Sequence, residues 1–296
     1  MRLAILILCF ATTAFAKQPQ FVVDSAWLAA HLKDADLVLL HVGNKDDYAK
    51  QHTPGARLVS LADISLSDHS GKGLMLEMPP ADDLRARLEA LGISDRSRVV
   101  VYYGKDWVSP ATRVIFTLDY AGLSASLLDG GMGAWTRAGN AVTDAVPPAR
   151  KGTLSPLKTR PLVVDAATVK SRLGRSGFAV VDGRTAAFYD GVETGGAHEQ
   201  AHKTGHIAGA RSIPFVTVTN DDLTLKSAAD LRALFDKAGV KKGDTVIGYC
   251  HIGQQATAML FAARTLGHDV LLYDGSFEDW SRQPGALVET TPETTR

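Results

Sequence analysis

Residues 244–263 read Asp-Thr-Val-Ile-Gly-Tyr-Cys-His-Ile-Gly-Gln-Gln-Ala-Thr-Ala-Met-Leu-Phe-Ala-Ala. An apolar run rich in β-branched residues stops at Cys250, a short loop with one glycine follows, and a stretch of Ala, Leu and Phe then predicts a buried helix. A strand–loop–helix of this kind aims backbone N–H groups and a helix N-terminus at the sulfur, and both favour a thiolate over a thiol. We therefore interpret Cys250 as a nucleophile, although a lone cysteine is often an inert core residue.

Residues 1–16 have the pattern of a secretory signal peptide. They combine a basic start, an apolar run that is too short to span a bilayer and a final Ala-x-Ala cleavage pattern. Cys9 lies within the apolar run and lacks the small residue that precedes a lipidated cysteine. We expect cleavage after Ala16 and a periplasmic or secreted mature chain, 17–296, in which Cys250 is the remaining cysteine.

The overall composition is that of an ordinary globular protein without a strong charge bias. Lys and Arg together number 32, as do Asp and Glu, and 45% of the residues are hydrophobic. Balanced charge gives no support for a nucleic-acid binder or a polybasic membrane-surface protein. Beyond the signal peptide, no segment has the length and apolarity of a membrane-spanning helix, so we expect no membrane insertion of the mature chain.

The chain contains two copies of one sequence pattern in the same order. The matching segments are 52–57 with 206–211, 83–93 with 230–240, 98–103 with 245–250, and 127–135 with 272–280. The pairs at 83–93 and 230–240 both predict an amphipathic helix closed by glycine. A spacing of about 150 residues is too long for a solenoid unit, so the pattern indicates a duplicated domain.

Each copy alternates short apolar strands with helices, which predicts an α/β fold with a parallel sheet flanked by helices. Residues 146–161 carry four prolines and four basic residues and are typical of a linker. The predicted organisation is a first domain at 17–145, the linker at 146–161 and a second domain at 162–296.

The two copies differ where a nucleophile is expected. Tyr103 corresponds to Cys250, and the loop that follows Tyr103 is two residues longer than its counterpart. We interpret Tyr102 and Tyr103 as strand residues that pack in the core. The second copy therefore carries the predicted chemistry, and the first serves as scaffold.

Together these features resemble the tandem rhodanese-like sulfurtransferases. The resemblance rests on a His-x-x-Gly-Ala-Arg element and an Asp-Gly-x-x-x-x-Trp element in both halves, and on Cys250 in the second half alone. It implies two small α/β domains, the first inactive, and a cysteine in the second that carries sulfur as a persulfide. No cofactor is then expected, because the cysteine itself holds the sulfur.

The resemblance also implies the parts of the site. The loop after Cys250 is expected to form an N–H nest for the thiolate and the persulfide; its residues are His251, Ile252, Gly253, Gln254, Gln255 and Ala256. An anionic donor and a thiophilic acceptor, such as cyanide, a thiol or a thiol protein, would react in two half-reactions with ping-pong kinetics.

Cationic and structural residues around the cysteine are also implied by the resemblance. Arg184 is the expected substrate-orienting cation, and Arg211 is expected to border the same region. A structural ion pair with Asp182 or Asp274 is the alternative for either arginine. We expect Asp182, His206 and Asp274 to hold the scaffold.

The loop departs from the patterns of relatives that prefer one donor. It lacks the two cations of a Cys-Arg-Lys-Gly-Val-Thr loop and the serine of a Cys-Gly-Ser-Gly-Val-Thr loop, and Phe188 stands where many relatives have a second arginine. We favour thiosulfate over 3-mercaptopyruvate. If protonated, His251 would supply part of the missing charge; a solvated loop histidine is the alternative. Gln254 or Gln255 would donate to a donor's oxygens or cap the following helix.

Three other functions are weighed against this one. A Cys-x5-Arg phosphatase needs an arginine where Ala256 stands. His198-Glu-Gln-Ala-His202 is a formal zinc motif if it lies on a helix, with His206 four residues further on, but its short, glycine-rich setting does not favour a helix. A non-catalytic persulfide carrier remains an alternative, since a persulfide-forming cysteine suits a carrier too, and it would turn over poorly with small acceptors.

Overall fold

The computed structural model describes residues 20–104, 107–197 and 200–291. It contains two five-stranded sheets with the orders β1-β5-β4-β2-β3 and β11-β7-β12-β13-β6, and every strand pair in them is parallel. The strands of the first sheet are β1 (Val22–Val23), β2 (Leu37–Val42), β3 (Arg57–Val59), β4 (Arg98–Tyr103) and β5 (Ala125–Leu128). Those of the second are β6 (Val163–Val164), β7 (Phe178–Asp182), β11 (Arg211–Ser212), β12 (Thr245–Tyr249) and β13 (Val270–Tyr273). Read from β1 and from β6, the two orders are the same, which confirms the predicted duplicated α/β fold.

Helices cover both faces of each sheet. In the first half they are α1 (Ser25–His31), α2 (Lys45–Lys50), the 3-10 turn η1 (Leu61–Asp63), α3 (Ala81–Ala90), α4 (Ser109–Tyr120) and α5 (Gly131–Arg137). In the second half they are α6 (Ala166–Arg172), α7 (Ala186–Asp190), η2 (Phe215–Val218), α8 (Ala228–Lys237), α9 (Ala256–Thr265) and α10 (Ser276–Arg282). Two short antiparallel pairs join β8 (Gly196–Ala197) to β9 (Gln200–Ala201) and β10 (His206–Ile207) to β14 (Val288–Glu289).

The two predicted amphipathic helices are α3 and α8, and both predictions are confirmed. Glycines follow them in the left-handed region, Gly92 with a φ of 87° and Gly239 with a φ of 75°. Only glycine adopts this conformation without strain from a Cβ atom, so the duplicated glycines end both helices at the same place.

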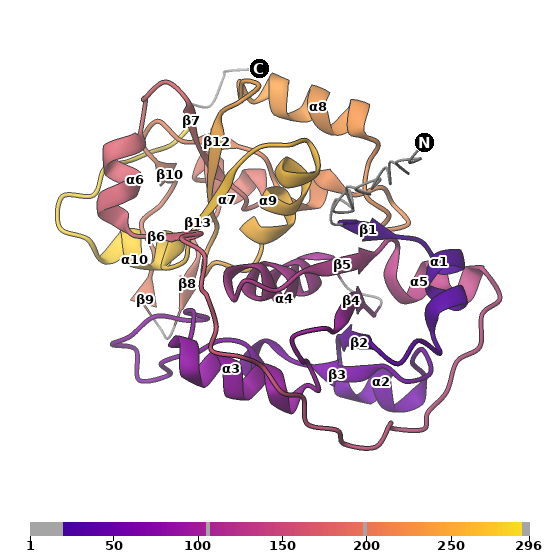
Figure 1. Cartoon of the computed structure of the whole chain (residues 1–296). Helices are drawn as coiled ribbons and strands as arrows, with labels where there is room; N and C mark the ends of the chain where they lie inside the picture. The colour runs from indigo at the N-terminus through magenta and orange to yellow at the C-terminus, as the bar shows by residue number, and fades with distance from the viewer. Residues whose placement is uncertain (1–19, 105–106, 198–199, 292–296) are drawn as a thin grey trace, which may run out of the picture.

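The apolar core is continuous across the two halves. Buried residues of α3, α4, α8 and α9 belong to one cluster, whereas α1 and α5 pack on the outer face of the first sheet and α6 and α10 on the outer face of the second. Figure 1 shows α4 and α9 side by side between the sheets, and the two helices contact each other. The predicted linker lies in a stretch without helix or strand between α5 and β6, yet Leu154 is buried in the shared core.

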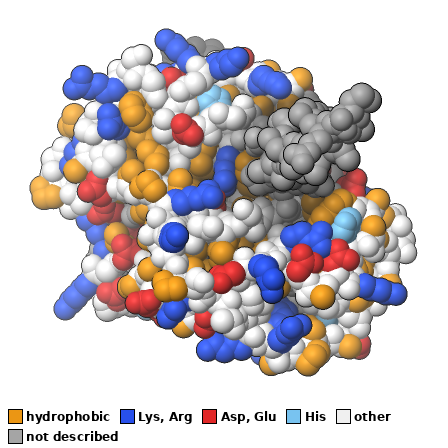
Figure 2. Space-filling model, viewed as in Figure 1, with side chains coloured by type: hydrophobic (Ala, Val, Ile, Leu, Met, Phe, Trp, Pro, Cys, Tyr) orange, Lys and Arg blue, Asp and Glu red, His pale blue; other side chains and the backbone are white. Residues whose placement is uncertain are grey.

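The surface carries charges of both signs. On the face shown in Figure 2, Lys and Arg side chains are interspersed with Asp and Glu. Within the described part of the chain, none of the helices is long and apolar enough to cross a membrane. The predicted signal peptide lies outside the described residues.

Candidate active site

Cys250 lies directly after β12, at the carboxyl end of a strand with neighbours on both sides. Its side chain is only 1% exposed, and its N–H donates to Ser276 Oγ at 3.2 Å. The helix α9 begins at Ala256, so the strand, loop and helix predicted from the sequence are present. Loops at the carboxyl ends of parallel strands are where α/β proteins place their binding sites.

The first two carbonyl groups of the loop face the start of α10. The Cys250 carbonyl accepts the Phe277 N–H at 3.0 Å, and the His251 carbonyl accepts the Glu278 N–H at 3.0 Å. All peptide bonds in the described chain are trans, so the C=O and N–H of one peptide point in opposite directions. The N–H groups of His251 and Ile252 are therefore turned away from α10, which is compatible with the anion-binding nest expected from the sequence.

The carbonyl group of Gly253 is held by a residue from the other half of the molecule. Its oxygen accepts a hydrogen bond from Arg113 Nη1 at 2.9 Å, which turns the Gln254 N–H to the opposite side. Gly253 has a φ of 79°, and a Cβ at this position would lie 2.8 Å from the Asp274 carbonyl oxygen. Both the backbone conformation and the close approach require glycine here.

Arg184 is held beside the site by a buried ion pair. Its Nη2 lies 2.6 Å from Asp182 Oδ2 and also donates to the Gly205 carbonyl at 2.7 Å, while the guanidinium stacks 4.0 Å from the Phe277 ring centroid. Burial disfavours the charged form, but the hydrogen bond and charge of Asp182 outweigh it, and a Cys250 thiolate adds to them, so the pKa of Arg184 is raised. Arg184 is therefore a permanent positive charge within electrostatic reach of the sulfur.

The histidines near the cysteine are neutral. Burial, with the positive charge of Arg184, lowers the pKa of His251 to about 3 and that of His202 to about 4. Their ring centroids lie 6.0 Å apart, and neither ring nitrogen of His202 has a hydrogen-bond partner among the residues that the structure describes. The lowered pKa does not support the expectation that a protonated His251 adds charge to the loop, because partial burial beside a guanidinium favours the uncharged imidazole.

Phe188 lies beside the loop, and the two glutamines are part of it. The Phe188 ring meets the His251 ring edge-on at 4.5 Å between centroids, so an aromatic ring fills the place of the second arginine found in many relatives. Gln254 Nε2 donates to Ser109 Oγ of the first half at 3.3 Å. Gln255 precedes α9, but its side chain makes no capping hydrogen bond.

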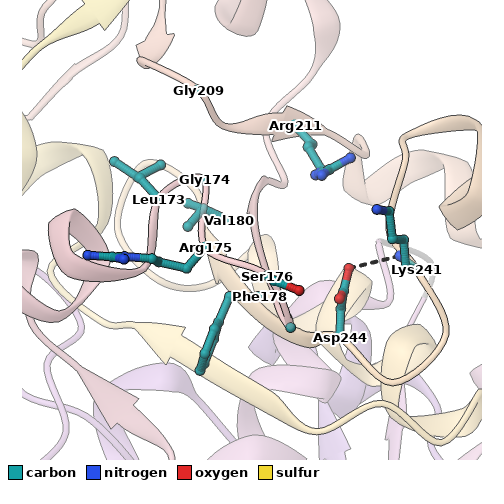
Figure 3. A pocket seen from close by; sticks show the side chains of 11 residues that line it. Leu173, Gly174, Arg175, Ser176, Phe178, Val180, Gly209, Arg211, Lys241 and Asp244 are labelled. Carbon is teal, nitrogen blue, oxygen red and sulfur yellow. Dashed lines mark hydrogen bonds between the residues drawn. The ribbon is translucent and has the colours of Figure 1, made fainter.

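Arg211 does not border the cysteine, and this expectation was wrong. Its Nη1 donates to the Ala238 carbonyl after α8 at 2.9 Å, and its side chain lines a pocket of about 270 Å³ with Lys241 and Asp244. Figure 3 shows these side chains around the pocket. Because Asp244 immediately precedes β12 and Cys250 follows it, the pocket lies at the other end of that strand.

The other duplicated residues make matching internal contacts. His206 Nδ1 lies 2.7 Å from the Tyr189 carbonyl oxygen, as His52 Nδ1 lies 2.7 Å from that of Tyr48. Each histidine also stacks on the tyrosine that it contacts. Since one half lacks the cysteine, these contacts serve both halves alike and are structural.

The described residues of the formal zinc motif, 200–202, are not helical. His202 follows β9, and β8 and β9 form a short antiparallel pair; His198 and Glu199 lie outside the described residues. Over the ranges that the structure covers, no group of three or more His, Cys, Asp or Glu residues is placed to hold a metal ion.

Sequence reasoning missed the residues that the first half contributes. Arg113 is fully buried and ion-paired with Asp274 across the halves at 2.7 Å, and Ser109 and Thr112 contact the start of α9. No local motif marks these residues, because the segments of the second half that they contact lie more than a hundred residues away in the sequence. The only available signal in the sequence is an arginine in a predicted buried helix, where Val-Ile-Phe directly follows Arg113.

Comparison with known proteins gives the family of this chain. A family model described as a rhodanese-like domain matches residues 24–138 and 165–283. The chain is 32% identical over 279 residues to the "Putative thiosulfate sulfurtransferase SseB" of Mycobacterium tuberculosis, covering 90% of this chain and 95% of that protein. It is 30% identical over 278 residues to the "Probable 3-mercaptopyruvate sulfurtransferase" of Pseudomonas aeruginosa, covering 89% of this chain and 95% of that protein. The solved structure of YnjE matches with a TM-score of 0.81 at 26% identity, covering 92% of this chain and 68% of that one.

The chain therefore belongs to the family of proteins with rhodanese-like domains, and it carries two of them in tandem. Relatives over about nine tenths of its length are named as sulfurtransferases, and this chain is a sulfurtransferase of the rhodanese type.

Proposed function

We propose that the protein moves sulfane sulfur from a small anionic donor to cyanide or a thiol through a persulfide on Cys250. The position of Cys250 carries this proposal: it lies inside a loop whose carbonyl groups bond outward, to α10 and to Arg113. The N–H groups so turned inward favour a thiolate and then a persulfide anion at the same place. No cofactor is needed, since the sulfur is bound covalently to the protein.

The reaction divides into two displacements. The Cys250 thiolate attacks the outer sulfur of thiosulfate, the donor's S–S bond breaks, and sulfite leaves with the electron pair. Cyanide then attacks the outer sulfur of the Cys250 persulfide, thiocyanate leaves, and the thiolate is restored. Arg184 and the loop N–H groups stabilise negative charge in both steps, and they are in place before the reaction begins.

Thiosulfate is the favoured donor, and 3-mercaptopyruvate is the second. Both are anions, and relatives at nearly equal identity bear names for each. With His251 neutral, the positive field at the loop comes from Arg184 and backbone dipoles. A fixed field of this kind suits an anion whose charge is spread over several oxygens.

A persulfide carrier is the second candidate. Cys250 is almost fully buried, which favours a sulfur that is protected from solvent between loading and delivery. A carrier would accept sulfur from a protein partner and pass it to a thiol protein, and it would turn over slowly with cyanide.

Intact-mass measurement tests the proposal directly. The mature protein is measured alone, after thiosulfate and again after cyanide; we expect the gain of one sulfur atom and its removal. Repeating the loading with 3-mercaptopyruvate ranks the two donors. No gain with either small donor would overturn the proposed enzyme function and leave the carrier loaded by a protein.

We also propose that the protein is exported, on the signal-peptide pattern of residues 1–16 alone. N-terminal sequencing of protein from the periplasmic or secreted fraction should begin at Lys17. A cytoplasmic protein that retains Met1 would contradict this.

A further inference from the structure

One side chain of the non-catalytic half contacts both the Cys250 loop and the segment that follows β13. Arg113, in α4, is fully buried. Its Nη1 donates to the Gly253 carbonyl at 2.9 Å and to Asp274 Oδ1 at 2.7 Å, and its Nη2 donates to the Leu76 carbonyl. The rigid, planar fork of the guanidinium fixes these three acceptors relative to one another.

The contact with Gly253 controls the direction of a peptide in the nest. Since the carbonyl and the N–H of a trans peptide point in opposite directions, holding the Gly253 carbonyl toward Arg113 keeps the Gln254 N–H on the nest side. The left-handed Gly253 has no Cβ to fix its orientation, and a Cβ there would lie 2.9 Å from Arg113 Nη1. Glycine permits this backbone conformation, and the hydrogen bond from the arginine fixes the direction of the carbonyl group.

The contact is specific to the catalytic site, because the duplication does not repeat it. Thr112 and Thr257 occupy corresponding positions, so the residue that corresponds to Arg113 is Ala258. The Tyr103 hydroxyl of the first half donates to the carbonyl of Leu223 in the second half at 2.6 Å. Leu76 corresponds to Leu223, since the two leucines precede the matching Asp83 and Asp230 by the same distance. Cys250 stands in place of the tyrosine, and Arg113 donates to the Leu76 carbonyl instead.

The guanidinium is also incompletely bonded for a purely structural group. Its Nε is buried and has no hydrogen-bond partner within the described part of the chain. A buried donor without a partner costs stability, so the orientation that reaches Gly253, Asp274 and Leu76 is kept in spite of this cost.

We propose that Arg113 of the non-catalytic half is a positioning residue for sulfur transfer, acting on the Cys250 nest through the Gly253 carbonyl. The proposal depends on the proposed function only because that function names the reaction that the nest serves. Without Arg113, the 253–254 peptide loses its outward partner, one N–H of the nest loses its alignment, and the anionic sulfur is less stabilised.

The test uses Arg113→Met and Arg113→Lys in the full mature chain, with Arg264→Met as the matched control. Arg264 makes another ion pair between the halves, with Asp119 at 2.6 Å, but it does not contact the loop. Three quantities are measured: the melting temperature, the pH midpoint of Cys250 alkylation by iodoacetamide, and the rate of persulfide loading by thiosulfate.

We expect Arg113→Met to raise the alkylation midpoint by about one pH unit and to slow loading on the order of tenfold to a hundredfold. Lysine keeps the charge but cannot reach three acceptors, so Arg113→Lys should be intermediate. Arg264→Met should lower the melting temperature without moving the midpoint or the loading rate. Wild-type values for both quantities in a folded Arg113→Met protein would overturn the proposal.

Removing the arginine alone leaves Asp274 buried without its partner, which can prevent folding. The double variant Arg113→Met with Asp274→Asn removes both charges, and the same criteria apply to it. If the wild-type protein does not load sulfur at all, the proposed function fails, but the alkylation midpoint still decides whether Arg113 positions the nest.

Discussion

Thr112 and Thr257 share a hydrogen bond of 2.9 Å between their hydroxyl groups, and they occupy corresponding positions in the two halves. Gly122 and Gly267 fix the correspondence, because they follow α4 and α9 at equal distances from these threonines and both have a positive φ. Equivalent residues that contact each other lie on an approximate two-fold axis. The two halves therefore meet face to face through α4 and α9, and the start of the catalytic helix is part of that interface.

Removing either hydroxyl should destabilise the interface, and the effects of the two removals should be coupled. Both threonines are 1% exposed, so we expect Thr112→Val and Thr257→Val each to lower the free energy of unfolding by about 1 kcal/mol, and the double variant by less than the sum. Urea unfolding measures all three. Thr265→Val, which removes only a bond to the Ala262 carbonyl within α9, is the uncoupled control. Strict additivity would show that the shared bond contributes nothing.

Cys250→Ser should abolish turnover and leave the fold intact. Serine is close to cysteine in size, but its hydroxyl is a poor nucleophile without a base beside it. Thiocyanate formation and the circular-dichroism melting curve are the measurements. Tyr103→Phe, at the corresponding position of the first half, is the control and should turn over normally. A folded serine variant that remains active would sink the persulfide mechanism.

Gly253→Ala should slow sulfur loading by more than its loss of stability explains. Both Gly253 and Gly243 have a positive φ, 79° and 87°, but a Cβ has nothing within 4 Å at Gly243 and is crowded at Gly253. Gly243→Ala therefore isolates the conformational cost, about 1 kcal/mol, and should load normally. Equal loading rates for the two variants would mean that the loop accommodates a side chain.

The sequence was enough to predict the duplicated α/β fold and the place of Cys250. Both follow from local patterns: a buried strand that ends at a cysteine, and helices closed by Gly92 and Gly239. These signals lie within a few residues of the features that they predict. They also survive duplication, so each half supports the interpretation of the other.

The surroundings of Cys250 could not be predicted in the same way. The neutral state of His251 depends on burial beside Arg184 and His202, which meet it only in three dimensions. Arg113 contacts Gly253 from the other half, and no spacing in the sequence encodes that contact. The motif that contains Arg57 and Arg211 gave a wrong prediction for the opposite reason. It is duplicated because it is structural: Arg57 Nη1 donates to the Arg150 carbonyl at 2.7 Å.

A double variant can separate the two roles of Arg184. Replacing it alone leaves the fully buried Asp182 without its partner, which destabilises the fold and confuses the result. Arg184→Met with Asp182→Asn removes both charges, and we expect a folded protein whose KM for thiosulfate rises about tenfold, a loss of ~1.4 kcal/mol. Arg211→Met, at the pocket of Figure 3, is the control and should leave KM unchanged. An unchanged KM in the folded double variant would assign Arg184 to the scaffold alone.

Three histidines, the buried His41 and His202 and the partly buried His251, should make the protein lose stability as the pH falls below about 6.5. Burial lowers the pKa of His41 to about 4, of His202 to about 4 and of His251 to about 3, whereas the unfolded chain titrates near 6.5. Between these values the unfolded state binds protons that the folded state does not, so each histidine reduces the free energy of unfolding by at most about 1.4 kcal/mol per pH unit.

Chemical unfolding at pH 7, 6 and 5 measures this slope above the range in which most carboxylates titrate. His202→Gln and His251→Gln should each reduce the slope of the free energy of unfolding against pH by the contribution of one proton. His41→Gln, in the half without the cysteine, should do the same without affecting sulfur loading. If the slope is unchanged in all three variants, the histidines are solvated in solution and the neutral pair beside Cys250 does not exist. If the slope falls only for His202 and His251, the neutral environment belongs to the catalytic half, and the field at the persulfide comes from Arg184 and the backbone of the loop.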